Sequence, residues 1–215
     1  MPDRIKSRSL FDEVQKTLEQ SKQLREQSLR VRDLADQRFG IANPNAPAAL
    51  SRFLFLIGRW RCEAKVLVET KWRTFEATWH GRFILDGYAI ADEYRMRDPA
   101  GELIVLGLNL RTYDPARQIW NIKWLNALTG TWTDLGAEEL GGVRFDGRSI
   151  IYAFKEPAAP HAYTRATYTN ISRAHFTWRG EKSDDGKAWT EFMIVEAYRS
   201  QDSQARPEVL PLASW

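Results

Sequence analysis

The chain has 215 residues, of which 43% are hydrophobic, 27% charged and 12% aromatic. These proportions are typical of a soluble globular protein, and the length suits one large domain or a domain with an arm. The net charge of +3, from 31 basic and 28 acidic residues, is too balanced for a nucleic-acid-binding protein, which normally carries a clustered basic face. We therefore expect no nucleic-acid partner.

Further features of the sequence bear on compartment. Cys62 is the single cysteine, so no internal disulfide can form, and its place in an apolar row favours a buried, inert thiol. The charged N-terminus lacks the apolar segment of a signal peptide, and no apolar run approaches membrane-spanning length. We expect a cytoplasmic protein with no membrane partner.

The first predicted element is a long N-terminal α-helix over residues 9–39, a span without Gly or Pro and rich in helix formers. Its apolar stripe is thin and the rest of its surface is polar, so we do not expect a fully buried helix. Two interpretations stay open. The helix either lies solvated on its own domain, or it packs on a second subunit and forms a homodimer.

A linker follows the helix. Gly40 ends the helix, and Asn43-Pro-Asn-Ala-Pro47 has the composition of a loop. A short helical turn is expected at residues 48–56. We therefore divide the chain into a helical arm and linker over 1–45, a β-domain over 46–200 and a tail over 201–215.

The first strand has the clearest pattern in the chain, because its side chains alternate between apolar and polar. The apolar positions are Trp60, Cys62, Ala64, Val66 and Val68, and the polar positions are Arg61, Glu63, Lys65 and Glu69, with Leu67 breaking the pattern. A period of two predicts one buried face and one solvated face.

Nine more strands follow, separated by turn signals such as Asp86-Gly87 and Asp184-Asp-Gly186. The predicted strands are 59–69, 72–85, 88–97, 102–113, 117–126, 131–139, 149–155, 163–171, 174–182 and 187–199. Short loops with no helices between strands imply antiparallel pairing of neighbours. A sheet of this size should close on itself, because an open edge invites aggregation.

Several strands carry substantial side chains on both faces. In 103–113, one row is Ile104, Leu106, Leu108 and Leu110, and the opposite row is Gly107, Asn109, Arg111 and Tyr113. In 117–126, Trp120, Ile122 and Trp124 alternate with Asn121 and Lys123. The pattern leaves open which row faces inward. Taken together, aromatic rows with a few polar groups are typical of a barrel that encloses a small-molecule site.

Three segments carry a resemblance to a known family. They are Leu56-Ile-Gly-Arg-Trp60, the segment from Arg111-Thr-Tyr-Asp114 to Trp120, and the segment from Ser183 through Trp189 to Arg199. A Gly-x-Trp at the entrance to the first strand of an antiparallel barrel resembles the calycin superfamily. Within it, the chain resembles a bacterial lipocalin-like family related in architecture to nitrobindins and fatty-acid-binding proteins.

The resemblance covers residues 53–200 and implies a mainly β fold. That fold is an antiparallel closed lipocalin-like (calycin) β-barrel of about ten strands, here preceded by the long helix. It also implies that Trp60 plugs the base of the barrel and that Arg199 stacks over it, an arrangement that cation–π attraction would favour. These two residues are structural and do not identify a ligand.

Metal chemistry has little support, because His80, His161 and His175 are far apart in sequence and only one thiol is present. We expect no metal and no cofactor. A nitrobindin-like haem site would need one histidine directed into the cavity, and His175 is the best candidate for it.

Acid–base chemistry on an aromatic substrate needs ionisable groups facing the cavity. The candidate catalytic residues are Glu93, Arg111, Lys123, Tyr168 and Glu191, and the candidate ligand-binding residues are Tyr94, Asn109, Tyr113, Trp120, Trp124 and Trp178. Arg111 or Lys123 could stabilise an oxyanion, the glutamates could act as a base, and Tyr168 could act as an acid. Taken singly, each charged residue is as well explained by a surface ion pair.

We interpret the chain first as a protein that binds a small hydrophobic, aromatic organic molecule inside the barrel. The alternatives are a cofactor-independent lyase or isomerase in the same cavity, a haem-binding protein, and an interaction module whose barrel is filled and whose helix recruits a partner. A cavity would favour small-molecule binding and the lyase or isomerase, and a lumen packed with side chains would exclude both.

Overall fold

The computed structural model describes residues 15–24, 40–156 and 159–200, and the chain divides into two units, 1–38 and 39–215. Residues 15–24 form a short α-helix on which every side chain is exposed. The sequence predicted a long helix over 9–39; the rest of that span and the predicted tail lie outside the described residues. Within the described residues, no helix is both long enough and apolar enough to cross a lipid bilayer.

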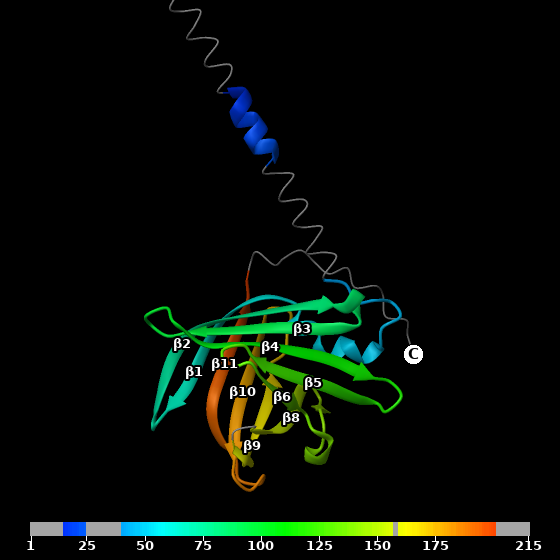
Figure 1. The fold of residues 1–215 in the computed structure, drawn as a ribbon, viewed down its shortest axis with the longest axis vertical. Helices are drawn as coiled ribbons and strands as arrows, with labels where there is room; N and C mark the ends of the chain where they lie inside the picture. The colour runs from blue at the N-terminus through cyan, green and yellow to red at the C-terminus, as the bar shows by residue number, and fades with distance from the viewer. Residues whose placement is uncertain (1–14, 25–39, 157–158, 201–215) are drawn as a thin grey trace, which may run out of the picture. The chain divides into compact units, whose positions relative to one another are not determined.

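The second unit is mainly β-structure: eleven strands form one antiparallel sheet (Figure 1). The strands are β1 (Gly58–Val68), β2 (Lys71–Ile84), β3 (Ala89–Arg97), β4 (Leu103–Asp114), β5 (Ile119–Asn126), β6 (Thr131–Leu135), β7 (Arg144–Asp146), β8 (Ser149–Glu156), β9 (Ala159–Thr169), β10 (His175–Ser183) and β11 (Thr190–Arg199). Their order in the sheet is β6-β5-β4-β3-β2-β1-β11-β10-β9-β8-β7. Apart from β6 and β7, strands adjacent in the sequence pair, as the short loops predicted, and β1 also pairs with β11.

The sheet curls into a half-barrel and does not close, so the predicted closed barrel of about ten strands is corrected to an open sheet of eleven. The opening lies between β6 and β7, the two edge strands. The predicted strand 131–139 ends at Leu135 because Gly136 leaves the extended conformation, with φ of +71°, and the short 3₁₀ helix η3 (Glu138–Leu140) follows. One hydrogen bond, from Gly136 N to Ala153 O at 3.1 Å, still connects the end of β6 to β8.

The helical turn predicted at 48–56 is present as the 3₁₀ helix η1 (Ala48–Leu56), which buries Leu50, Phe53 and Leu56. Its last turn lies directly on β2, since a Cβ added at Gly81 would stand 2.1 Å from the Leu56 carbonyl oxygen. The ring of Phe53 packs edge-on against Trp120, with centroids 4.7 Å apart. Thus η1 contributes its aromatic side chains to the core on the inner face of the sheet.

Trp60 and Arg199 lie opposite each other on β1 and β11. The Arg199 guanidinium carbon lies 4.0 Å from the centroid of the Trp60 ring. Its Nη1 donates to Ile57 O at 2.8 Å, and the Trp60 indole N–H donates to Leu56 O at 3.0 Å. The contacts join the end of η1 to both strands.

The inner face of the sheet is apolar on most strands. On β1, the predicted apolar side is buried at Trp60, Cys62 and Ala64. On β4, the polar row faces inward instead, with Arg111 fully buried, whereas Ile104 from the leucine row is 40% exposed. The sheet therefore encloses polar groups at one place in an otherwise aromatic and aliphatic interior.

Candidate functional site

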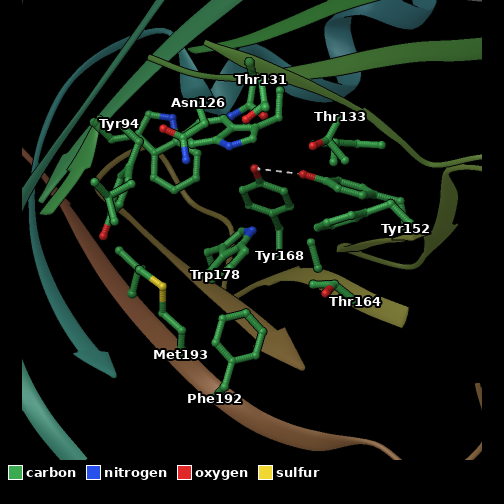
Figure 2. Close-up of a pocket in the computed structure, with 18 of the residues that line it drawn as sticks. Tyr94, Asn126, Thr131, Thr133, Tyr152, Thr164, Tyr168, Trp178, Phe192 and Met193 are labelled. Carbon is green, nitrogen blue, oxygen red and sulfur yellow. Dashed lines mark hydrogen bonds between the residues drawn. The ribbon is translucent and has the colours of Figure 1, made fainter. Parts of the chain in front are cut away.

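A cavity of about 630 Å³ lies on the inner side of the half-barrel (Figure 2). Nine of the eleven strands contribute to its walls, all except β1 and β7. The lining residues are Trp79, Tyr94, Val105, Asn109, Trp124, Asn126, Thr129, Thr131, Thr133, Leu135, Tyr152, Phe154, Thr164, Ala166, Tyr168, Trp178, Phe192, Met193 and Val195. The lining is largely aromatic and aliphatic, with amide and hydroxyl groups as its polar component.

Burial of the lining residues changes along the cavity. Thr129 and Thr131, at the turn between β5 and β6, are exposed, whereas Tyr168 and Val195, on β9 and β11, are fully buried. The exposed part of the lining is therefore near the β5–β6 turn, and we call the buried part, to which Tyr168 belongs, the floor of the cavity.

Two glycines make room for the indole rings of the walls. A Cβ added at Gly107 on β4 would lie 2.1 Å from the ring of Trp124, and one added at Gly180 on β10 would lie 2.6 Å from the ring of Trp178. Real Cβ atoms do not approach other heavy atoms this closely. The absence of side chains at these positions lets both rings lie against the sheet, which keeps the lumen open.

The floor contains two tyrosine hydroxyls that point toward one another (Figure 2). The oxygens of Tyr152 and Tyr168 are 3.4 Å apart. Behind them, Nη2 of Arg111 donates a hydrogen bond of 3.0 Å to the Tyr168 hydroxyl. The guanidinium carbon of Arg111 also lies 4.9 Å from the centroid of the Phe53 ring. Arg111 thus reaches the cavity through Tyr168 and does not line it.

Asp92 is the acidic partner of Arg111, and both side chains are fully buried. Nε of Arg111 lies 2.8 Å from Oδ1 of Asp92, an ion pair without hydrogen-bond alignment. The other carboxylate oxygen, Oδ2, accepts hydrogen bonds from Trp79 Nε1 at 2.8 Å, Asn109 Nδ2 at 2.7 Å and Arg111 Nη2 at 3.2 Å. Three donors on one oxygen hold the carboxylate in a fixed position.

Burial shifts the pKa values of the ionisable groups in this cluster. It raises the pKa of Asp92, against the opposing effects of Arg111 and of the hydrogen bonds from Asn109 and Trp79. Burial also raises the pKa values of Tyr152 and Tyr168, although the charge of Arg111 lowers both. For Arg111, burial lowers the pKa, but the carboxylate of Asp92 and the oxygens of Tyr168 and Tyr152 outweigh it, so the guanidinium stays protonated. Both tyrosines consequently remain neutral hydrogen-bond donors near neutral pH.

Five of the predicted site residues line the cavity: Tyr94, Asn109, Trp124, Tyr168 and Trp178. They came from both predicted sets, four as ligand-binding residues and Tyr168 as an acid. They lie on β3, β4, β5, β9 and β10, so curling of the sheet brings them together from distant parts of the sequence.

The other candidates lie elsewhere. Glu93, Lys123 and Glu191 alternate with inward-facing residues, and each is partly exposed and ion-paired, with Arg95, Asp134 and Arg179 respectively. Tyr113 and Trp120 pack on each other, with centroids 5.4 Å apart, and do not line the cavity. Register explains the placement of Glu93, Lys123 and Glu191, because a side chain one position away from an inward residue points to the opposite face. Tyr113 and Trp120 share the inward rows of Asn109 and Trp124 but lie toward the other end of their strands, where Trp120 packs against Phe53 of η1.

The haem candidate His175 also lies away from the cavity. Its Nε2 is 2.8 Å from Oε2 of Glu196, and its ring packs on Tyr198. None of the described residues that line the cavity is a histidine. Nor do the described residues contain a group of three or more His, Cys, Asp or Glu side chains arranged to hold a metal ion.

Two residues of the site were not among the candidates that the sequence patterns predicted: Tyr152 in the floor, and Asp92 behind it. For Asp92 a signal was available: it is the one charged residue in the row formed by Ile90, Asp92, Tyr94 and Met96, all of which are buried. A lone carboxylate in an apolar row predicts a buried partner. For Tyr152, within Ile150-Ile-Tyr-Ala-Phe154, the sequence gives no comparable signal, since aromatic residues in strands are usually core.

No protein-family model and no curated protein matches the chain. Among solved structures, the fold is similar to that of Rv2717c from M. tuberculosis, with a TM-score of 0.51 and 11% identity over 73% of this chain and 100% of that one. The redesigned β-barrel mFAP0 bound to DFHBI matches with a TM-score of 0.34 and 14% identity, over 67% of this chain and 99% of that one. At 11% identity, the similarity to Rv2717c concerns the fold alone.

Proposed function

We propose that the protein binds a small, largely apolar, aromatic organic molecule in the cavity of the half-barrel. The observation that carries the proposal is the cavity itself. Its volume of about 630 Å³ lies within the range of roughly 300–1,000 Å³ that is usual for ligand pockets. Its lining combines apolar walls with a few polar groups, which is the usual composition of such sites.

The walls favour a flat ligand. Trp79, Trp124 and Trp178 line the cavity together with Phe154 and Phe192. Aromatic rings pack well on one another in stacked or edge-to-face arrangements, which contribute beyond the burial of area alone. No lysine, arginine, aspartate or glutamate is among the described lining residues, so an uncharged ligand is favoured over an ionic one.

A cofactor-independent lyase or isomerase is the second candidate for the same cavity. The observation in its favour is the bond from Arg111 to Tyr168, which polarises a hydroxyl that could protonate or stabilise a substrate oxygen. General-base catalysis would also need an acceptor of protons, and the described lining residues offer no carboxylate or imidazole. Binding is therefore the better-supported function. The haem alternative has less support, because His175 is held by Glu196.

Titration of the full-length protein with N-phenyl-1-naphthylamine, a neutral dye that fluoresces in apolar surroundings, tests the proposal. We expect saturable binding of one dye per chain. Ala166→Phe should abolish binding, because Ala166 lines the cavity and is almost fully buried.

Thr167→Phe is the matched control, because Thr167 follows on the same strand and points to the other face of the sheet. It should bind dye as the wild type does. Undiminished binding to Ala166→Phe, with the variant folded by circular dichroism, would show that the dye binds elsewhere and would refute the proposal.

A further inference from the structure

The hydroxyl groups of the cavity floor contain one more proton than they can place among themselves. Tyr168 accepts a hydrogen bond from Arg111, and a guanidinium can only donate. The Tyr168 proton must therefore point away from Arg111. The nearest hydroxyl oxygen is that of Tyr152, at 3.4 Å.

Whichever of the two tyrosine hydroxyls donates to the other, one hydroxyl proton is left without an acceptor. If Tyr168 donates to Tyr152, the Tyr152 proton is left; if Tyr152 donates, the Tyr168 proton is left. Trp178, which also lines the cavity, has an indole N–H that can only donate, so it supplies no acceptor. Arg111, Tyr152, Tyr168 and Trp178 thus hold no further acceptor for the remaining proton. Both tyrosines line the cavity, so that proton is available to a ligand there.

A ligand that completes this cluster must present a hydrogen-bond acceptor at its deep end. The charge of Arg111 is already compensated by Asp92 at 2.8 Å, so the floor has no free cation to neutralise a carboxylate. A buried carboxylate without a counterion is costly, whereas a neutral carbonyl oxygen accepts two hydrogen bonds without carrying charge into the interior. The chemistry of the floor therefore fits a ketone, an aldehyde or a quinone.

The contact of 3.4 Å between the two hydroxyls is long for an O–H···O bond, so a ligand oxygen can replace it and free both protons. We propose that the cavity selects a neutral conjugated carbonyl compound, whose oxygen replaces this contact and accepts a hydrogen bond from each of Tyr152 and Tyr168, while its rings lie between the indoles of the walls. The inference rests on the proposed function and specifies its ligand class. Arg111 positions the donors, since its bond to Tyr168 sets the direction in which that hydroxyl can donate.

The test compares two ligands that differ in the carbonyl group. The first is 6-propionyl-2-(dimethylamino)naphthalene, whose emission moves to longer wavelength when its carbonyl accepts a hydrogen bond. The second is the 6-propyl analogue, which lacks the oxygen. With the full-length protein, the ketone should bind about tenfold more tightly, as expected for two buried hydrogen bonds. Its bound emission should be shifted to the red of its emission in hydrocarbon.

Tyr152→Phe and Tyr168→Phe keep the rings and remove one hydroxyl each. Either variant should reduce the preference for the ketone to about threefold or less, as expected for the loss of one hydrogen bond, and shift its bound emission to the blue. Tyr198→Phe is the matched control, because Tyr198 is 50% exposed, packs on His175 and does not line the cavity. It should preserve both the preference and the emission.

Several results would overturn the inference while leaving the proposed function intact. They are equal binding of the ketone and the propyl analogue by the wild type, an effect of Tyr198→Phe as large as that of the floor variants, or tighter binding of 2-naphthoate than of the ketone. Failure of both naphthalenes to bind, together with failure of N-phenyl-1-naphthylamine, would refute the proposed function and this inference together.

Discussion

Replacing Arg111 by methionine tests the buried cluster most directly. The change removes the charge while retaining much of the length of the side chain against Phe53. Asp92 is then a fully buried carboxylate that retains only its bonds from Trp79 and Asn109. Removing one member of a buried ion pair costs about 3–5 kcal/mol, because the other charge is left uncompensated. Asp92→Asn should cost a similar amount, since it leaves Arg111 unpaired.

The double variant Asp92→Asn/Arg111→Met distinguishes loss of pairing from loss of packing. It contains neither charge, and the asparagine oxygen can still accept from Trp79 and Asn109. We expect it to lose about 1–3 kcal/mol, the cost of an unsatisfied polar group, and so far less than the sum of the two single changes. Urea unfolding followed by tryptophan fluorescence gives the three free energies of unfolding by linear extrapolation.

The pH dependence of Arg111→Met adds a second readout. Arg111 lowers the pKa of Asp92 against the effect of burial, so its removal should move that pKa further above the usual value of 3.8. A carboxyl whose folded-state pKa is raised contributes stability that is fully present below its unfolded value and is lost as the pH rises through the folded value. Arg111→Met should therefore be more stable at pH 5 than at pH 8, and the double variant should lack this difference. Single changes that cost less than about 1 kcal/mol, or that add in the double variant, would refute the argument.

Three further predictions concern other parts of the molecule. Gly107→Ala should weaken binding of N-phenyl-1-naphthylamine about tenfold, because the new Cβ would displace the Trp124 ring into the cavity; unchanged affinity would contradict this placement. Burial raises the pKa of Cys62 from 9.0 to about 12, so stability should fall as the pH rises through this window. In urea unfolding between pH 9 and 10, Cys62→Ala should show a shallower fall than the wild type, and equal slopes would contradict the assignment. If the N-terminal helix joins two subunits through Leu18 and Leu24, which are 64% and 66% exposed, lysine at both positions should convert a dimer to a monomer by light scattering; a monomeric wild type would refute this proposal.

The parts of the fold that could be predicted are those that local physics determines. The alternation along β1 requires one buried face, and the structure buries Trp60, Cys62 and Ala64 as expected. The short loops predicted antiparallel pairing of strands that are adjacent in the sequence, and the structure shows it. The helical turn predicted at residues 48–56 is present at Ala48–Leu56. The open edge could not be predicted in this way. It depends on Gly136 and on β7, a strand of three residues with no alternation to detect.

The candidate site was harder to predict because register between strands decides it. On β4, hydrophobicity alone would place the leucine row inside, yet Asn109 and Arg111 face the core. Their partner is Asp92, which lies opposite Asn109 in the ladder between β3 and β4. A polar row can face inward only where a neighbouring strand supplies partners at the same level. The sequence of a single strand does not show which residues of the neighbouring strand lie opposite its polar row.

Two features that reduce the stability of the β-sheet domain lie on the same side of the sheet. The interior contains a buried ion pair, which well-packed apolar residues often replace without loss of stability, and beside it a cavity of about 630 Å³ that larger side chains could fill. The consequence appears on the outer face, where Ile104 remains 40% exposed because β4 turns its polar row inward. Natural sequences depart from local rules mainly where function requires it. Because these two features meet at Tyr152 and Tyr168, the floor of the cavity is the part of the molecule where the binding function that we propose best explains the cost in stability.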